Sequence, residues 1–282
     1  MQRAQGTGIK NRRLISSLVL CAFCLIPIAA AAQFGFGPRG YPPKFANEDS
    51  FGHGFNFCRA MYTSGRREAG GQGWSPDYPD AELNFSIRLG ELTKMRVSKD
   101  SYGAPEHLVV RLTEDALFQC PYLHMEDVGT AGFTDAETQG LRAFLLKGGF
   151  LWVHDYWGSY AWNNWVSQLA RVLPPSEYPI RDVPLDHPIF RTMFDVKELP
   201  QIPSIQFWRQ SGGSISERGP DSDTPHIRGV SDKNGNLMVL MTHNTDISDA
   251  WEREGEDPRF FYNFSPNGYA VGINVILYAV TH

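Results

Sequence analysis

Two short apolar runs in this chain are each followed within five residues by histidine and aspartate, the residue types that act as general bases or bind cations. The runs are residues 150–153 and 237–241, and both are apolar enough to be buried strands. In an open α/β sheet, ligands bind outside the carboxyl ends of the strands. A catalytic set drawn from these two ends would consist of Asp155, His243 and Asp246.

Simpler roles compete with catalysis at both ends. Side chains alternate along a regular strand, so His154 and Asp155 would not act on one atom, and Asp155 could simply cap the next helix. At the second end, His243, Asp246 and Asp249 could hold a zinc, iron or manganese ion. Their spacing of three and three matches no tight metal signature, so we assign no metal ligand and expect no cofactor.

Other polar and aromatic residues are candidates for binding a ligand at the same edge. Trp74, Asp77 and Tyr78 lie in a glycine-rich loop, and four tryptophans lie between residues 152 and 165. These tryptophans are typical either of core packing or of a platform on which a sugar or aromatic ring stacks. The predicted ligand-binding residues are Trp74, Asp77, Tyr78, His154, Trp157, His187 and Asn244, although His187 also fits a simple turn between prolines.

The elements that must position these residues alternate between strand and helix. Thr134 and Glu137 have the spacing of a capping box, and Gly148 and Gly149 end the helix that it starts. The pattern predicts strands at 55–62, 95–97, 117–125 (interrupted at Pro121), 150–153 and 236–241, and helices at 80–92, 134–147, 160–173 and 268–282. Such alternation predicts an α/β fold with an open, mostly parallel sheet and helices on both faces.

The first 32 residues differ from the rest of the chain. Basic residues precede an apolar stretch at 14–29, and three alanines precede Gln33, as in a secretory signal peptide. A retained membrane anchor is the alternative, and the adjacent Arg12 and Arg13 leave open the Sec and twin-arginine export routes. We therefore expect a signal at 1–32, an extended segment at 33–54, a domain at 55–282 and a periplasmic or secreted location.

Charge and cysteine content limit the partners. Removal of residues 1–32 takes away four Lys/Arg and no Asp/Glu, which changes the formal net charge from −5 to −9. An acidic protein is a poor partner for nucleic acid, whose binding depends on basic side chains. The expected partner is a small polar ligand or an envelope protein, with membrane contact only through an uncleaved signal. Cys58 and Cys120 remain, either as a disulfide or as two thiols.

Several separate motifs resemble a known bacterial family, domain of unknown function 4159. The resemblance covers roughly residues 55–282 and rests on WSPDYPDAELNFSIRLGELT, GGFLWVHDYWG, PLDHPIF and MTHNTDISDAWEREGEDP, followed by GYAVGINVILYAVTH. That family looks related to class I glutamine amidotransferase-like and trehalose-utilisation-type domains, which implies a flavodoxin-like sheet. In the amidotransferases the turn after the matching strand carries a nucleophilic cysteine, where this chain has Asp155 or Tyr156.

Two hypotheses about function follow. The first is a non-catalytic envelope module that binds a ligand or partner, because the expected nucleophile is missing. The second is a hydrolase, with or without a metal ion, because imidazole and carboxyl groups follow two strands. Whether the protein is an enzyme is left open. Both hypotheses require the two strands to be neighbours that deliver their polar ends to one crevice, formed by Trp74, Asp77, Asp155, Trp157, His243 and Asp246.

Overall fold

The computed structural model describes residues 41–52, 54–68 and 71–281. The expected signal peptide, 1–32, lies outside the described residues. Residues 44–282 form one compact unit, and the described residues of the other unit, 41–43, have no regular secondary structure. Within the described part of the chain, no helix combines the length and the hydrophobicity needed to cross a membrane.

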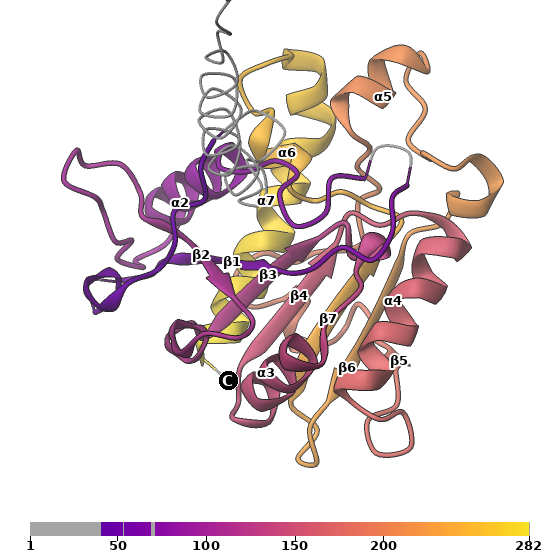
Figure 1. The fold of residues 1–282 in the computed structure, drawn as a ribbon. Coiled ribbons are helices and arrows are strands. Elements are labelled where there is room, and N and C mark those ends of the chain that lie inside the picture. Colours follow the sequence, from indigo (N-terminus) through magenta and orange to yellow (C-terminus); the bar gives the residue numbers. More distant parts are fainter. Residues whose placement is uncertain (1–40, 53, 69–70, 282) are drawn as a thin grey trace, which may run out of the picture. The chain divides into compact units, whose positions relative to one another are not determined.

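A seven-stranded sheet with the order β2-β1-β3-β4-β7-β6-β5 forms the centre of the unit (Figure 1). Its five strands from β2 to β7 are parallel, and β6 and β5 continue it in antiparallel pairing. The strands are β1 (Phe57–Met61), β2 (His107–Arg111), β3 (Tyr122–Glu126), β4 (Phe150–His154), β5 (Arg181–Asp182), β6 (His226–Ser231) and β7 (Leu237–His243). The predicted open, mostly parallel α/β fold is confirmed.

Helices cover both faces of this sheet. The α-helices are α2 (Asp80–Leu92), α3 (Asp135–Leu146), α4 (Gly158–Val172), α5 (Ile205–Gln210), α6 (Asp249–Glu252) and α7 (Pro258–Thr281). Short 3-10 helices are η1 (Glu48–Ser50), η2 (Asp115–Gln119), η3 (Val128–Thr130), η4 (Pro188–Phe190) and η5 (Gly219–Ser222). One core contains residues of α3 and α4, and the other contains residues of α2, α6 and α7. In Figure 1, α3 and α4 lie in front of the sheet and α7 passes behind it.

Strand β4 shows how this arrangement follows from the sequence. The predicted capping box is present, since the Thr134 side chain accepts from the Glu137 amide and the Glu137 side chain accepts from the Thr134 amide. Gly148, with φ of +96°, reverses the chain directly into β4. Along β4, Leu151 belongs to one core and Trp152 to the other. A strand buried on both faces reads as one continuous apolar run, which is why it was predicted.

The strands β4 and β7 lie side by side, as both functional hypotheses require. Leu151 pairs with Val239 and Val153 with Met241 in parallel register. Beyond the paired segment, the Asp155 amide donates to the Thr245 carbonyl and the Asn244 amide donates to the Tyr156 carbonyl. These bonds hold the two strand ends against each other.

Several predicted elements are wrong. Residues 95–97 form no strand, only an isolated bridge between Val97 and Phe55, and the second parallel strand is β2 instead. Residues 117–119 belong to η2, because β3 begins only after Pro121. The antiparallel β6 lies in a stretch for which the sequence pattern predicted no strand. The C-terminal helix begins at Pro258 and not at 268, with Pro266 inside it.

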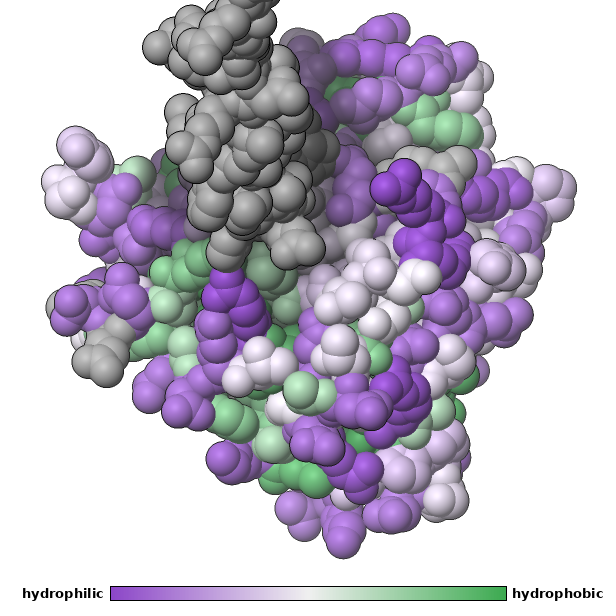
Figure 2. Space-filling view, viewed as in Figure 1, coloured by the Kyte–Doolittle hydropathy of each residue, from purple (hydrophilic) through white to green (hydrophobic). Residues whose placement is uncertain are grey.

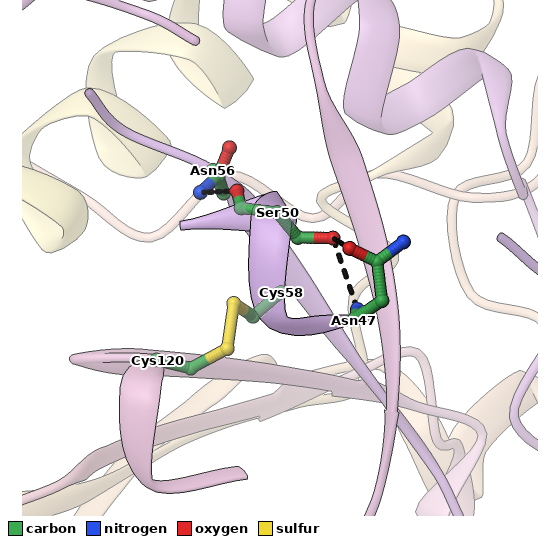
Figure 3. The surroundings of a disulfide bond; sticks show 5 residues. All are labelled: Asn47, Ser50, Asn56, Cys58 and Cys120. Carbon is green, nitrogen blue, oxygen red and sulfur yellow. Dashed lines mark hydrogen bonds between the residues drawn. A yellow bond between two sulfur atoms is a disulfide. The ribbon is translucent and has the colours of Figure 1, made fainter. Parts of the chain in front are cut away.

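Cys58 of β1 and Cys120, which precedes β3, form a disulfide (Figure 3). Both residues are almost fully buried, with exposed fractions of 1% and 3%. The bond lies beneath the N-terminal segment, where Asn47 and Ser50 form a capping box and Asn56 donates to the Ser50 carbonyl. On the face shown in Figure 2, hydrophilic residues form most of the surface and hydrophobic residues appear in smaller patches.

We predict that replacing both cysteines, as Cys58→Ala with Cys120→Ala, lowers the free energy of unfolding by about 4 kcal/mol. The reason is that the bond closes a loop with a sequence separation of 62, which restricts the unfolded chain. Urea titration of both proteins measures the difference. Reductant added to the folded wild-type protein should have little effect because the bond is buried, and equal unfolding midpoints for wild type and variant would contradict the prediction.

Candidate functional site

Four neighbouring parallel strands each lead to an aspartate at the carboxyl edge of the sheet. Asp127 follows β3 and Asp155 follows β4 directly, Asp246 lies three residues after β7, and Asp77 lies in the loop between β1 and α2. In Figure 1, α5 and α6 lie beyond this edge, at the top of the view. The topology therefore gathers four carboxyl groups that are far apart in the sequence.

Three of these aspartates have left-handed backbone conformations. The φ angles of Asp77, Asp127 and Asp155 are +60°, +49° and +52°, and Asn244 at the end of β7 has φ of +62°. Aspartate and asparagine adopt this region more readily than other residues with a Cβ atom. At the ends of β3 and β4 this turn interrupts the alternation of the strand, and the first residue after each strand, Asp127 or Asp155, lies at the edge of the sheet.

These aspartates line a cavity of about 230 Å³, which we call the acidic pocket. Seven carboxyl groups and two guanidinium groups line it among the described residues, without residues 69 and 70. The lining residues are Glu68, Gly71, Gln72, Pro76, Asp77, Asp127, Asp155, Trp157, Ser204, Gln206, Glu217, Arg218, Asp246, Asp249 and Arg253. The carboxyl groups greatly outnumber the basic groups, so the pocket has a strongly negative potential when they are ionised.

Hydrogen bonds to the backbone hold several of the carboxyl groups in place. Asp127 accepts from the amides of Gln72 and Gly73 at 2.6 and 2.7 Å, which fixes the loop after β1 over the end of β3. Asp249 accepts from the Ile205 amide at 2.6 Å, and so joins α6 to α5. Each acid therefore connects two segments of the pocket wall.

Further bonds order the inner acids. Asp246 accepts from the Asp249 amide at 3.1 Å, and Asp155 accepts from the Trp157 indole at 3.0 Å. Oxygen atoms of Asp77, Asp246 and Asp249 lie within 4.8 Å of one another. The three come from the β1–α2 loop, the segment after β7 and the first residue of α6.

Burial and mutual repulsion raise the pKa of these acids. Burial is the main cause of the raised pKa of Asp77, Asp155, Asp246 and Asp249, and neighbouring carboxylates raise each of them further. Burial also raises the pKa of Asp127 to about 8, although its backbone hydrogen bonds act in the opposite direction. Bringing a positive charge into the pocket would favour the ionised form of all five groups.

A buried ionic network lies beneath the pocket. The Arg59 guanidinium of β1 is paired with Glu82 of α2 and Glu126 of β3, and all three side chains are fully buried. His124 bonds to Glu126 at 2.7 Å, and the next ring is that of His154, with 3.1 Å between the two Nε2 atoms. Although burial alone would raise the pKa of Glu126, the nearby Arg59 and His124 hold it well below its usual range.

The structure brings together four of the predicted site residues. Asp77, Asp155, Trp157 and Asp246 all line the acidic pocket. His154 lies behind them, fully buried, with its Nδ1 atom 3.9 Å from Asp246 Oδ1. Burial and the neighbouring His124 lower the pKa of His154 well below its usual value, so its ring is neutral. These residues therefore remain candidates for binding.

The structure does not bring His243 into the same pocket. The strand β7 extends to His243, two residues beyond the predicted strand, and only Asn244 turns the chain. The His243 ring packs between Tyr156 and His226, and its Nε2 atom is 3.1 Å from the Gly158 carbonyl. The proposed set of Asp155, His243 and Asp246 is therefore not one constellation.

The remaining predicted residues lie outside the lining of the acidic pocket. Asn244 accepts from the Gly158 amide and donates to the Thr224 carbonyl, which fastens the start of α4. Trp74, Tyr78 and His187 contact other aromatic rings or the backbone. Trp74 packs on Tyr78 with ring centroids 5.7 Å apart, the Tyr78 hydroxyl accepts from the Lys44 amide, and the His187 ring lies against Tyr278.

The tryptophans between residues 152 and 165 are mostly core residues. Trp152 and Trp165 are fully buried on opposite faces of the sheet, so the core interpretation is confirmed for them. Trp162 is half-buried between Tyr156, His243 and the Arg228 guanidinium. Trp152 and Trp165 therefore cannot stack on a ligand, and Trp157 is the one of the four tryptophans that lines the acidic pocket.

Sequence reasoning missed several pocket residues. Asp127 carries an available signal, since it is an acidic residue directly after an apolar strand, but it is not among the residues predicted from the sequence. Glu217, Arg218 and Gln206 come from the excursion between η4 and β6, and no local pattern marks them as site residues. Asp249 was considered only with His243 as a metal ligand, whereas its neighbours in space are Asp77 and Asp246.

Comparison with known proteins adds one finding. The model of a protein family described as Domain of unknown function (DUF4159) matches residues 61–280, which include β2 to β7 and every residue of the acidic pocket. No curated protein matches the chain.

We predict that His243 stays neutral until the pH falls to about 4, because burial lowers the pKa of its ring to that value. The unfolded chain binds the proton near pH 6.5, so protonation favours unfolding, and this contribution to instability grows as the pH falls from about 6.5 to 4. Titration of the His243 ring by NMR measures the midpoint. A midpoint near 6.5 in the folded protein would show that the ring is solvated, contrary to this packing.

We also predict that Arg59→Met lowers the free energy of unfolding by about 3–5 kcal/mol, because it leaves Glu82 and Glu126 buried without their counter-charge. The matched control is Arg191→Met. The partner of Arg191 is Asp195, which is half exposed and 3.9 Å away, so this substitution should lower the free energy of unfolding by less than about 1 kcal/mol. Urea titration compares the two. Equal effects of both substitutions would show that the buried network does not stabilise the fold.

Proposed function

This chain belongs to the DUF4159 family, whose description names no activity, and we propose that it is a non-catalytic binding module of the cell envelope. Its acidic pocket binds the positively charged group of a small polar ligand. The observation that supports this proposal is the seven carboxyl groups around one small cavity, with two guanidinium groups between them.

The volume and the chemistry of the pocket favour a small ligand over a protein partner. A cavity of about 230 Å³ is smaller than the usual pocket for a drug-sized molecule, which is about 300–1,000 Å³, so it fits a single charged group. Two of its acids, Asp127 and Asp249, are held by hydrogen bonds from backbone amides, so this part of the pocket is already formed before binding. A preformed site loses less entropy when the ligand binds.

An envelope location is consistent with two features of the chain. The N-terminal pattern is that of a secretory signal, and the Cys58–Cys120 disulfide is of a kind that forms in oxidising compartments. A formal charge of −9 without residues 1–32 also disfavours nucleic acid as the partner. We therefore place the binding function in the periplasm or outside the cell.

One observation favours the hydrolase alternative. Asp155 occupies the turn from β4 to α4 with a positive φ, the kind of strained strand-to-helix turn that exposes a nucleophile in many hydrolases. A carboxylate nucleophile must be ionised, however, and burial together with Asp77 and Asp127 raises the pKa of Asp155. His243 is not beside it, and both Cys58 and Cys120 are in the disulfide. Binding is therefore the better-supported function.

We predict that cations raise the melting temperature of protein that has been stripped of metal, with CaCl2, spermidine and L-arginine as the probes. A ligand at about 100 times its Kd should stabilise the protein by about 2.7 kcal/mol. The variant Asp155→Asn should lose most of this shift, since asparagine keeps the left-handed turn but removes a charge.

The matched control is Asp182→Asn, because Asp182 is 90% exposed on β5 and the same charge is removed outside the pocket. It should retain the full shift in melting temperature. If none of the three probes shifts the wild-type protein, or if both variants lose the shift equally, the acidic pocket is not the binding site.

A further inference from the structure

We infer that Asp77, Asp246 and Asp249 form a binding site for one hard divalent cation, of the class of calcium, magnesium or manganese. This inference rests on the proposed function and specifies the positively charged group that the acidic pocket binds. It departs from the expectation from the sequence, which assigned no metal ligand and considered His243 in the place that Asp77 occupies.

The geometry of the three carboxyl groups fits a single ion. One oxygen of each residue lies within 4.8 Å of the other two. Calcium binds oxygen at about 2.3–2.6 Å, so two ligands on opposite sides of the ion are about 4.6–5.2 Å apart and adjacent ligands are closer. Three oxygen atoms at these separations can all contact an ion placed between them with only small movements.

A buried atom without a partner points to the same place. The Oδ2 atom of Asp77 is inaccessible to solvent and has no hydrogen-bond partner. Removing a carboxylate oxygen from water without giving it a partner is unfavourable, and a bound cation supplies the missing interaction. The backbone holds Asp77 at this position, since its carbonyl accepts from the Ala81 amide at the start of α2 and its φ is +60°.

A second observation comes from outside the acidic cluster. His154 is fully buried, its Nδ1 atom has no hydrogen-bond partner, and this atom faces Asp246 Oδ1 at 3.9 Å. Groups that ligate a metal are usually supported from behind by a second polar group, and here an imidazole stands behind one of the three carboxylates. The support continues to the Arg59 network through His124 and Glu126.

The nearby basic residue does not replace a cation. Arg253 lies 3.7 Å from Asp249 Oδ1, but it is paired more closely with Glu252 at 2.6 Å and with Glu256 at 3.0 Å. The three ligands are all carboxylates, and no histidine nitrogen belongs to this group of described residues. Oxygen ligands select hard ions and disfavour zinc or copper, which prefer nitrogen and sulfur.

Isothermal titration of the EDTA-stripped protein with CaCl2, MgCl2 and MnCl2 tests the site. We expect at least one of these ions to bind with a stoichiometry of one. Each of Asp77→Asn, Asp246→Asn and Asp249→Asn should weaken that binding at least tenfold, while Asp182→Asn leaves it unchanged. Paramagnetic broadening by Mn²⁺ of NMR signals from residues around Asp246 gives an independent readout of the position.

The outcomes separate this inference from the proposed function. If no ion binds, or if the three Asn variants bind as tightly as wild type while their circular dichroism shows that they are folded, the metal site is refuted. If none of the metal ions binds, but spermidine or L-arginine binds to wild type and more weakly to Asp155→Asn, only the metal site is refuted. If all cations fail, both are refuted.

Discussion

Crowding of carboxyl groups at one edge of the sheet is the constraint on which the site depends. Like charges that are buried together repel, and here both burial and neighbouring acids raise the pKa of Asp77, Asp155 and Asp246. The fold tolerates this because the acids sit on strand ends that are fixed by the sheet, and because some of them accept hydrogen bonds from backbone amides. The carboxyl groups that give the pocket its negative potential therefore also destabilise the fold when they are ionised. A bound cation would reduce the repulsion between them.

The buried Arg59 network explains how the edge is supported from inside. Its guanidinium compensates Glu82 and Glu126 in the layer below the pocket, so these two acids do not add fully to the charge above. His124 and His154 then connect this layer to Asp246 as neutral rings. The lower acids are therefore compensated by Arg59, whereas the seven carboxyl groups of the pocket have two guanidinium groups among the described lining residues.

Prediction from the sequence succeeded where burial alone determined the structure. The strands β4 and β7 are buried on both sides, so they read as continuous apolar runs, and their parallel pairing followed from the helices between strands. It failed for β2 and β6. Polar residues surround the apolar centre of β2, and β6 lies between β7 and the edge strand β5 with only two buried residues. The pairing of Cys58 with Cys120 also required distances in space that no sequence pattern provides.

The site was predicted in part for the same reason. Asp155 and Asp246 were found because they follow apolar strands, but the exact residue at which each strand ends decides which side chain reaches the edge. The strand β7 extends to His243, and the left-handed turn at Asn244 comes after it, so the histidine stays packed on the sheet and the later aspartates reach the pocket. Because β7 is two residues longer than predicted, the imidazole of His243 is absent from the acidic pocket. The carboxyl groups of Asp246 and Asp249 line it instead, so the residues after β7 contribute oxygen atoms and no histidine nitrogen.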